Sequence, residues 1–591
     1  MSEGGRWIYD LETDGLLDTV SVIHCIALRN VDTGEGMLYG PGEIQMALDI
    51  LQRADEIIAH NGIAYDNEVI RMLHPEIDLD NVKVTDTLVL SRLIRANLMQ
   101  EDATSVFLLK ELPKKYMGSH SLAAWGYRTG NHKGDYDGGW ETYSEEMGSY
   151  CLQDTSVTLT IYNQFMKAGF SQESIDLEHD LAEICLEIGN NGWTFDIKAA
   201  SELYAKLAQR RDELGTELDD LFPPWTIETE FLPKVNNAKL GYIKGEIFIK
   251  KKVVSFNPAS RQHIHKCLVD KYKWKPKEFS ASGQAKIDDV VLSELPFPEA
   301  KRLAEYFLIQ KRIGMLAEGA GAWLKMVDDD GKIRHTIVSG ATISGRAAHR
   351  GPNLGQVPGT YSPYGKECRS LFTVPKDWYL VGSDLSGLEL RCLANNLNDN
   401  GEYAKQILEG DIHSYNAKAF GVDRPTAKTA IYSMIFGAGN PRLGAVVGGG
   451  AKEGAKLKDA YDKAVPAFAE LKRNLARAAK RGYLKGIDGR HLYLRSERNA
   501  LSQLLQGSGA IICKKWVQLV HKELKQKYGR DAQIIAWVHD EVQIACKTLE
   551  ISHGVQTITK RLATESGVAF KTKIPIDSEY SAPSRTWADT H

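Results

Sequence analysis

Two apolar runs near the end of the chain, residues 534–538 and 542–546, are separated only by His539, Asp540 and Glu541. Apolar runs on either side of a short polar turn predict an antiparallel β-hairpin. A charged hairpin tip at the surface explains such a turn when it stands alone. Three ionisable groups at one turn also favour a bound cation, and the rest of the chain decides between these interpretations.

A further carboxylate follows another predicted strand. Residues 379–382 form an apolar run that leads to Asp384, and the helical segment 386–391 then brings back Glu389. Two aspartates on adjacent strands can hold two Mg²⁺ ions, one that activates a primer 3′-hydroxyl and one that neutralises a triphosphate. The hairpin and this strand therefore predict one acidic site.

A predicted helix between these two segments carries four residues at intervals of four: Arg424, Lys428, Tyr432 and Phe436. At 100° per residue the four positions drift by only about 40° per step, so they share one stripe of the helix. Such a stripe can hold triphosphate oxygens with its cationic half and stack a base and sugar on its aromatic half. If this stripe faced the hydrophobic core, Arg and Lys would not be expected at its first two positions.

A second set of carboxylates lies near the start of the chain. Asp10 and Glu12 fall where the strand 7–9 is expected to end, and alternation sends both side chains to one face. Asp66 follows in the next part of the chain, and Tyr150 and Asp154 share a helix face at i, i+4. Taken singly, the first pair is typical of a surface turn and the last of an ordinary helix face. Together, four carboxylates suit Mg²⁺ or Mn²⁺ and hydrolysis of a phosphodiester.

The charge pattern matters more than the total charge. The 591 residues give a prior of about four domains, and 73 Lys and Arg against 77 Asp and Glu give a net charge of −4, which by itself argues against a polyanionic partner. However, residues 234–277 contain twelve Lys and Arg against two acids, and residues 452–485 contain ten against four. Each run alone is typical of a solvated face, whereas two such runs favour contact with phosphates.

Other classes of protein are disfavoured. The chain has no secretory signal and no apolar run long enough for a membrane span, so a cytosolic location is expected. Its eight cysteines contain no CxxC pair, which argues against a zinc site and a disulfide framework. The patch 448–450 lacks the continuation of a P-loop.

The order of elements indicates several domains. Strands at 7–9, 20–28 and 57–59 with a helix at 85–94 predict an α/β domain that ends near residue 190. Helices at 199–221 and 299–324, interrupted by the basic stretch 222–258, predict a helical arm. The strands 379–382, 534–538 and 542–546 bracket the helical block 402–481, which predicts one α+β domain with a helical insertion.

The motifs resemble those of known enzymes. Asp10-x-Glu12, the segment from Asn61 to Tyr65-Asp66, and Tyr150-x-x-x-Asp154 are similar to the DEDD-type 3′→5′ proofreading exonucleases with a tyrosine in the last motif. Asp384 with Ser-Gly-Leu-Glu-Leu-Arg, the segment from Arg424 to Tyr432, and His539-Asp540-Glu541 resemble motifs A, B and C of family A DNA polymerases, the DNA polymerase I class. The sequences of these motifs, together with the terminal His591, are most similar to those of the replicative polymerases of short-tailed phages. The resemblance covers almost the whole chain.

The resemblance implies a fold and its domain boundaries. It implies an α/β RNase H-like exonuclease domain and an α+β right-hand polymerase domain with palm, fingers and thumb. The expected boundaries are 1–190 for the exonuclease, 191–334 for the thumb, 335–412 and 500–591 for the two parts of the palm, and 413–499 for the fingers.

It also implies roles for individual residues. Metal ligands of the polymerase site would be Asp384, Asp540 and the carbonyl of Leu385, with Glu541 beside them as a further catalytic residue. Metal ligands of the exonuclease site would be Asp10, Glu12, Asp66 and Asp154, with Tyr150 orienting the attacking water. The incoming nucleotide would meet His413, Arg424, Lys428, Tyr432, Phe436 and, near its 2′ position, Glu389. The primer-template minor groove would meet Arg346, Asn353, Gln356, Asn499, Gln506 and His539.

The expected function is template-directed DNA synthesis with 3′→5′ proofreading, with two Mg²⁺ ions per active site and Mn²⁺ as the alternative ion. Expected partners are primer-template DNA and deoxynucleoside triphosphates; a replicative helicase-primase and a single-stranded DNA-binding protein are further candidates. The short region near 222–252 argues against a thumb insertion that recruits thioredoxin. Location would be the host cytoplasm for a phage enzyme. A single-subunit RNA polymerase and a decayed DNA-binding scaffold are the alternatives.

Two positions depart from the family pattern. The family usually has tyrosine where this chain has Phe436, and its hydroxyl there pairs with the motif A glutamate, so Glu389 is expected to be less firmly held. Ser433 stands where glycine is common, and no consequence of this follows from the sequence.

Overall fold

The computed structural model describes residues 4–280 and 282–590, which form two compact units. Unit 1 runs to Trp193 and also contains Arg334–Val357 and the chain from Thr373 onward. Unit 2 contains Thr194–Ile333 and Pro358–Phe372. The candidate sites for chemistry all lie in unit 1.

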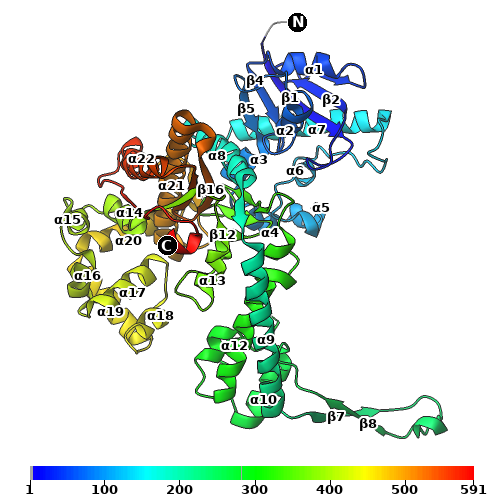
Figure 1. The fold of residues 1–591 in the computed structure, drawn as a ribbon, viewed down its shortest axis with the longest axis vertical. Helices are drawn as coiled ribbons and strands as arrows, with labels where there is room; N and C mark the ends of the chain where they lie inside the picture. Colours follow the sequence, from blue (N-terminus) through cyan, green and yellow to red (C-terminus); the bar gives the residue numbers. More distant parts are fainter. Residues whose placement is uncertain (1–3, 281, 591) are drawn as a thin grey trace. The chain divides into compact units, whose positions relative to one another are not determined.

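The beginning of unit 1 is a sheet covered by helices, drawn mainly in blue in Figure 1. The strands are β1 (Arg6–Thr13), β2 (Ile23–Asn30), β3 (Gly36–Tyr39), β4 (Glu56–Ala59) and β5 (Lys83–Asp86), in the order β3-β2-β1-β4-β5. The main helices are α1 (Ile44–Leu51), α2 (Asp66–Leu73), α3 (Thr87–Ile94), α6 (Leu122–Thr129) and α7 (Glu145–Met166). Successive side chains of β1 point to opposite faces of the sheet and pack in two different cores. Trp7 and Tyr9 pack with α1 and α2, whereas Ile8 packs with α3, α6 and α7.

Several boundaries expected in this region were wrong. The strand expected over 20–28 runs instead from Ile23 to Asn30. The first strand does not end at residue 9 but continues to Thr13, because it pairs with β2 along this length. The helix expected from residue 85 begins at Thr87, since the side chain of Asp86 accepts hydrogen bonds from the backbone N–H groups of Leu88 and Val89 and caps it.

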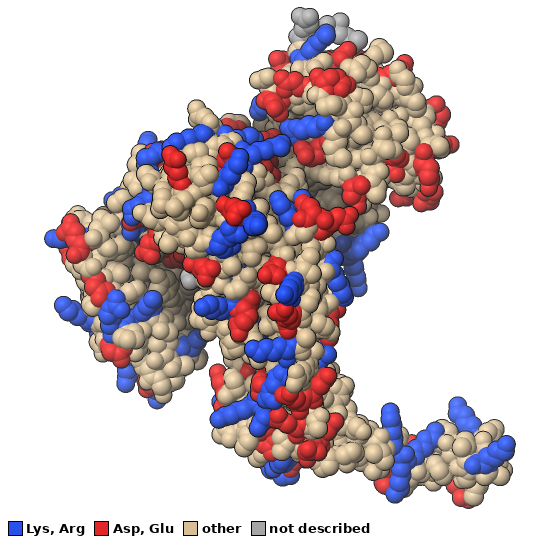
Figure 2. Space-filling view, viewed as in Figure 1, with Lys and Arg blue, Asp and Glu red and all other residues tan. Residues whose placement is uncertain are grey.

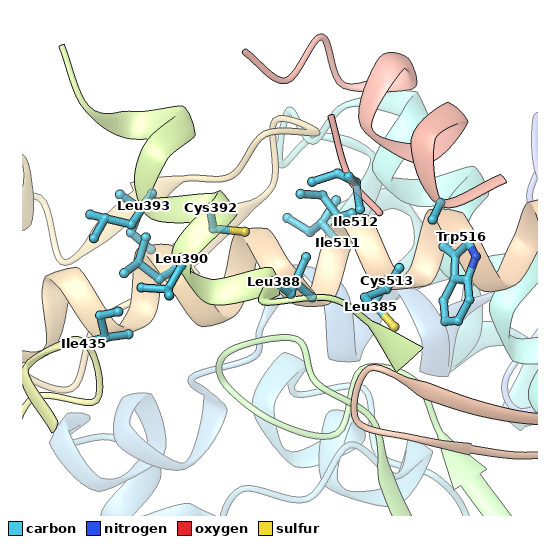
Figure 3. Packing of buried hydrophobic residues seen from close by; sticks show 14 of the residues in the cluster. Leu385, Leu388, Leu390, Cys392, Leu393, Ile435, Ile511, Ile512, Cys513 and Trp516 are labelled. Atoms are coloured by element: carbon cyan, nitrogen blue, oxygen red, sulfur yellow. The ribbon is translucent and has the colours of Figure 1, made fainter. Parts of the chain in front are cut away.

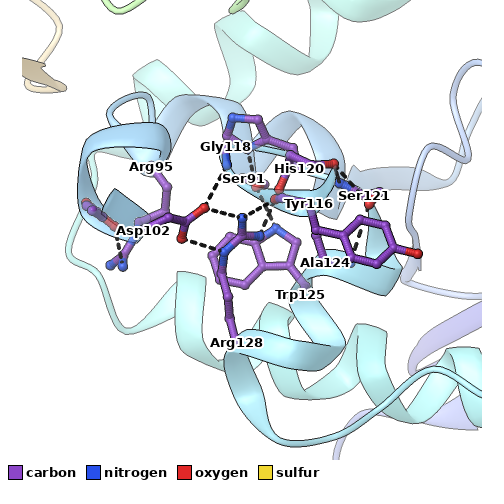
Figure 4. A network of polar contacts seen from close by, with 12 residues as sticks. Ser91, Arg95, Asp102, Tyr116, Gly118, His120, Ser121, Ala124, Trp125 and Arg128 are labelled. Atoms are coloured by element: carbon purple, nitrogen blue, oxygen red, sulfur yellow. Dashed lines mark hydrogen bonds and ion pairs between the residues drawn. The ribbon is translucent and has the colours of Figure 1, made fainter. Parts of the chain in front are cut away.

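A buried polar network fixes α6. The guanidinium of Arg128 donates to both carboxylate oxygens of Asp102, at 3.0 and 2.7 Å, and Asp102 also accepts from the N–H of Gly118 (Figure 4). The indole of Trp125 donates to Ser91 on α3 at 2.9 Å. These contacts hold α6 in place, and with it the start of the loop that leads to α7.

The later part of unit 1 is built on a second sheet. Its strands are β13 (Tyr379–Leu385), β16 (Ala532–Val538), β17 (Glu541–Cys546) and β18 (Ser578–Tyr580), in the order β16-β17-β13-β18. The long helices α21 (Ala500–Tyr528) and α22 (Leu549–Ala569) pack against it, and α14 (Leu388–Asn396) packs against α21. Leu388 and Cys392 of α14 lie beside Ile512 and Cys513 of α21 in this core (Figure 3). The hairpin predicted around the turn 539–541 is confirmed.

A helical insertion follows α14, as expected. It consists of α15 (Glu402–Leu408), α16 (Ile412–Phe420), α17 (Arg424–Ile435), α18 (Asn440–Ala445), α19 (Ala451–Ala464) and α20 (Pro466–Ala479), followed by the short hairpin β14 (Tyr483–Lys485) and β15 (His491–Tyr493). Buried side chains of these helices belong to the same core as the second sheet.

Buried charges connect distant parts of unit 1. Glu178 on α8 (Gln172–Asn191) forms ion pairs with Arg490, next to β15, and with Lys514 on α21, and all three side chains are at most 5% exposed. Burial alone would raise the pKa of Glu178, but the charges of Lys514 and Arg490 outweigh it and lower this pKa to about 2. The ion pairs hold the first domain, the insertion and α21 together.

Unit 2 is mostly helical. Its helices α9 (Ile197–Leu221), α10 (Arg261–Tyr272), α11 (Asp289–Ser293) and α12 (Pro298–Ile313) enclose a small core. The helix expected to reach residue 324 ends at Ile313, and a π-helical turn, Gly314–Glu318, follows it. The basic stretch, for which no strand was predicted, forms a hairpin of β7 (Trp225–Phe231) and β8 (Phe248–Val254). The lysines on this hairpin are visible in Figure 2.

Among the described residues, no helix is both long and apolar enough to cross a membrane.

Candidate active sites

The four carboxylates expected at the exonuclease site come from three elements of unit 1. Asp10 and Glu12 lie on β1, Asp66 is the first residue of α2, and Asp154 lies on α7, which packs against β1. Glu12, Asp66 and Asp154 are 9%, 5% and 1% exposed. These carboxylates are thus largely removed from water and close enough to influence one another.

Their pKa values report this crowding. Burial raises the pKa of Glu12 to about 8, and the charges of Asp154 and Asp66 add to the effect. Burial raises the pKa of Asp66 to about 7. Burial and then the charge of Asp154 raise the pKa of Asp10 well above its usual value. Such a group of acids favours a cation, because the cation compensates the repulsion that burial strengthens.

Lys133, which no sequence motif singled out, supplies a positive charge here. Its ammonium forms an ion pair with Oδ2 of Asp154 and lies 4.4 Å from the ring centre of Tyr150. The amide of Gln153 on α7 donates to Asn131 Oδ1 and to the carbonyl of His132, each at 2.9 Å, so the loop is fixed to the helix that carries the site. The basic residue follows the end of α6 with no motif around it, so only the fold could identify it.

The donor set fits a hard divalent cation. Oδ1 of Asp154 is buried and has no hydrogen-bond partner among the described residues. Ligand atoms of Asp10, Glu12 and Cys151 lie within 4.8 Å of one another. Carboxylate oxygens suit Mg²⁺ or Mn²⁺, whereas the thiol of Cys151 donates to the carbonyl of Asp10 at 3.3 Å and is a soft ligand. We therefore count the carboxylates, and not Cys151, as candidate ligands.

The second acidic site lies where β13 meets the β16–β17 hairpin. Asp384 on β13 is the register partner of Glu541 on β17, and the N–H of Leu385 donates to the carbonyl of Asp540 at 3.1 Å. Burial, followed by the charges of Asp540 and Glu541, raises the pKa of Asp384 to about 8. Burial and then the charge of Glu389 raise the pKa of Asp540 to about 6. The structure thus brings together the two predicted aspartates.

Glu541 differs from these aspartates in its surroundings. Its Oε1 accepts hydrogen bonds from the indole of Trp587, at 2.8 Å, and from the amide of Gln543. Its side chain is therefore tied to the protein core, while Asp384 and Asp540 are the carboxylates that a cation would engage.

Glu389 is firmly held, against the expectation drawn from Phe436. Its Oε1 accepts a hydrogen bond from Nη2 of Arg346 at 2.9 Å, and its side chain is 14% exposed. Arg346 thus donates to Glu389 the hydrogen bond that was expected from a tyrosine hydroxyl in the family. Phe436 is instead 47% exposed, with its ring centre 6.3 Å from that of Tyr432.

The stripe predicted on the helix between the two acidic segments is present on α17. Tyr432 also lies 6.3 Å, between ring centres, from His413 on α16. Burial and the charges of Glu389 and Asp540 raise the pKa of Tyr432, which places this tyrosine beside the acidic site. At the other end of α17, Arg424 pairs with Asp411 at 2.7 Å, and Lys428 is exposed. Arg424 must therefore leave Asp411 to reach a phosphate.

The predicted DNA contacts are spread over several elements. Arg346, His539 and Asp540 line one small cavity. Asn353 directly precedes the turn Leu354–Gln356, and Gln356 is its last residue. This turn packs against β11 (Ala348–Arg350). Asn499 is the residue directly before α21, and Gln506 lies on that helix. His591 is outside the described residues.

The comparisons with known proteins identify the family. The sequence model of DNA polymerase family A matches residues 231–589. The chain belongs to DNA polymerase family A. Polymerases named DNA-directed DNA polymerase in Enterobacteria phage T3 and Escherichia phage T7 are each 34% identical to it over 705 residues, covering 99% of this chain and all of theirs.

More distant comparisons agree. DNA polymerase I of Pseudomonas aeruginosa is 25% identical over 464 residues, which cover 72% of this chain and 47% of that protein. The solved structure titled as the polymerase domain of Pol1 from M. smegmatis, in complex with DNA primer-template and dNTP, has a TM-score of 0.75 and 17% identity, covering 99% of this chain and 96% of that one. This family A polymerase thus has the fold class expected from its sequence, and the expectation of a DNA-directed DNA polymerase is confirmed.

Proposed function

We propose that this polymerase adds deoxynucleotides to a primer 3′ end under the direction of a template, through two divalent cations held by Asp384 and Asp540. The observation that carries the proposal is the pair of crowded aspartates beside the cationic and aromatic stripe of α17. When bound, the cations would lower the pKa of the primer hydroxyl and neutralise charge on the triphosphate. Mg²⁺ is the expected ion and Mn²⁺ the alternative.

The residues of α16 and α17 would position the incoming nucleotide. Lys428 and His413 would bind the triphosphate, and Arg424 would exchange Asp411 for phosphate oxygens. Tyr432 and Phe436 would stack against the base and sugar. Glu389, held by Arg346, would occupy the space near the 2′ position and disfavour ribonucleotides.

We infer that the first domain is a 3′→5′ proofreading exonuclease. Asp10, Glu12, Asp66 and Asp154 would hold its two cations, and the burial of Glu12, Asp66 and Asp154 supports this. The hydroxyl of Tyr150 would orient the attacking water, since it lies one helical turn before Asp154 on α7. Lys133 would leave Asp154 when a cation binds there.

The domain boundaries predicted from the sequence remain proposals. Unit 2 supports a thumb over 191–334, because its main segment is Thr194–Ile333. In the thumb, Lys250, Lys251 and Lys252 on β8 would contact the phosphates of duplex DNA. The alignment with the phage T7 polymerase runs over 705 residues, more than the 591 of this chain, so that relative contains segments without a counterpart here. A short thumb loop without a thioredoxin site remains the expectation from the sequence near 222–252.

One experiment separates the two activities. Asp384→Asn should abolish primer extension and spare degradation of a mismatched 3′ end, while the double variant Asp10→Ala, Glu12→Ala should do the reverse. Glu173→Gln, an exposed change on α8, is the matched control. Loss of both activities in either variant, with an unchanged melting temperature, would contradict the division of labour. Primer extension with and without thioredoxin would test the accessory partner.

A further inference from the structure

A small cavity in unit 1 lies outside both acidic sites. Its volume is about 80 Å³, and it is lined by Asn61, Arg92 on α3, Gly340 and Arg350 on β11. A space of this size accommodates a phosphate-sized group.

Two arginines line this cavity without a direct ion pair among the described residues. Within residues 4–280 and 282–590, neither Arg92 nor Arg350 donates a side-chain hydrogen bond or forms an ion pair. Burial lowers the pKa of Arg92, the charge of Asp86 acts against this, and the charge of Arg350 lowers the pKa further, so the two cations are close enough to repel each other. Two like charges held together at a cavity are characteristic of an anion site.

The acids that line the same cavity are already engaged. Asp86 accepts hydrogen bonds from the backbone N–H groups of Asn61 and Ile63, at 3.0 and 3.2 Å, and from the first turn of α3. Glu178 is paired with Arg490 and Lys514 through one oxygen, and accepts a hydrogen bond from Ser339 through the other. Neither acid therefore offers its oxygens to Arg92 or Arg350.

The walls of the cavity belong to segments that lead to both candidate sites. The segment Asn61–Ala64 precedes Asp66 of the proposed exonuclease site. Arg350 follows Arg346, which pairs with Glu389 in the polymerase site. The cavity is therefore lined by segments that adjoin residues of both candidate sites in the sequence.

We propose that Arg92 and Arg350 bind a backbone phosphate of the single-stranded primer end as it passes from the polymerase site to the exonuclease site. This inference rests on the proposed proofreading function. The recognised chemistry is a phosphodiester, which every nucleotide of the strand presents, so the site would act without regard to sequence. Free phosphate and pyrophosphate share this chemistry and must be tested as alternative ligands.

Binding is measured first, in an inactive background such as Asp10→Ala, Asp66→Ala, with a fluorescent single-stranded oligonucleotide. The double variant Arg92→Met, Arg350→Met should lower the affinity about tenfold or more, since it removes charge-assisted hydrogen bonds. It should also reduce the slope of log affinity against log salt by roughly 0.7 if one phosphate contact is lost. Arg53→Met, a change at an exposed arginine after α1, is the control and should leave both quantities unchanged.

A charge reversal distinguishes an anion site from a structural role. Arg350→Glu should pair with Arg92, raise the melting temperature and weaken strand binding at least as much as Arg350→Met. This single variant at an exposed position also serves if the change at Arg92 prevents folding. A reversed charge that lowers the melting temperature and leaves strand binding intact would overturn the proposal.

Transfer is measured with a fluorescent base analogue at a mismatched primer end. The double variant Arg92→Met, Arg350→Met should shift the mismatched primer end toward the polymerase site. It should leave extension of a matched primer unchanged. Strand affinity and salt slope equal to those of Arg53→Met would overturn the inference, as would arginine-dependent binding of inorganic phosphate or pyrophosphate without an effect on the strand. A wild-type protein that binds the strand in this way and does not degrade it would instead contradict the proposed exonuclease function.

Discussion

The ammonium of Lys133 is paired with the carboxylate of Asp154, one helical turn beyond Tyr150 on α7. The side chain of Asp154 is 2% exposed and that of Lys133 is 24% exposed. In the absence of a divalent cation the lysine therefore provides the positive charge nearest to a group of buried acids. Burial alone would lower the pKa of Lys133, but the charges of Asp154 and Asp10 outweigh it and raise this pKa, so the ammonium stays protonated at neutral pH.

We expect Lys133→Met to destabilise the metal-free protein by about 1–3 kcal/mol, because it leaves Asp154 buried without its partner. Mn²⁺ should restore more stability to this variant than to the wild type, since the cation no longer competes with the lysine. Melting temperatures with EDTA and with Mn²⁺ would measure both effects, and Lys110→Met, at an exposed lysine of the same domain, is the control. An equal response of variant and wild type to Mn²⁺ would contradict the competition.

Cation binding at the polymerase site should strengthen as the pH rises from about 6 to 8. The pKa values of Asp540 and Asp384 are raised to about 6 and about 8, and a cation binds the ionised forms. Affinity should rise by at most tenfold per pH unit for each proton displaced. Calorimetric titration of Mn²⁺ in an Asp10→Ala, Asp66→Ala background would detect the released protons, and Asp384→Asn should remove the step near pH 8. Affinity independent of pH would contradict the prediction.

The same shift has an opposite effect on the stability of the metal-free protein. Folded Asp384 holds its proton up to about pH 8, whereas the unfolded chain releases it near pH 4. The folded state therefore binds more protons between these values, and its stability falls as the pH rises through them. Asp384→Asn should flatten this part of the curve of melting temperature against pH.

Glu178→Gln should destabilise the protein by about 3–5 kcal/mol at neutral pH, because Arg490 and Lys514 would remain buried with their main acidic partner neutralised. The pKa of Glu178 is lowered to about 2, so the ion pairs stabilise the fold above the ordinary pKa near 4.5 and lose this effect as the pH falls toward 2. Denaturant unfolding at several pH values would show the difference from wild type shrinking below about pH 5. Glu173→Gln on the same helix should have no such effect.

Glu389→Ala should increase ribonucleotide incorporation relative to deoxynucleotides by roughly ten- to two-hundredfold, the range for a steric contact of this size. Phe436→Tyr should change this ratio little, since Arg346 already holds Glu389. Single-nucleotide extension with matched ribo- and deoxynucleotides would measure this ratio for both variants and the wild type. A large gain of selectivity in Phe436→Tyr would show that the arginine does not replace the tyrosine.

Local pattern predicted much of the fold. The hairpin at 539–541, the helix that carries Tyr150 and Asp154, and the stripe on α17 were predicted correctly because each depends on periodicity within a few residues. Boundaries failed where long-range pairing or a cap decided them, as in the continuation of β1 through Asp10 and Glu12. The β7–β8 hairpin was missed because its strands are polar and mostly exposed, so they carry no alternation of buried residues.

The sequence by itself determined the family, most of the order of the elements and the carboxylates that mark the two candidate sites, because these depend on residue type and spacing. Only the tertiary structure decided which charges meet. It paired Lys133 with Asp154, Arg346 with Glu389 and Glu178 with Lys514, and it left Arg92 and Arg350 beside one cavity. The physical reason is that ion pairs and pKa shifts depend on distance and burial, and the partners here come from segments separated by up to several hundred residues.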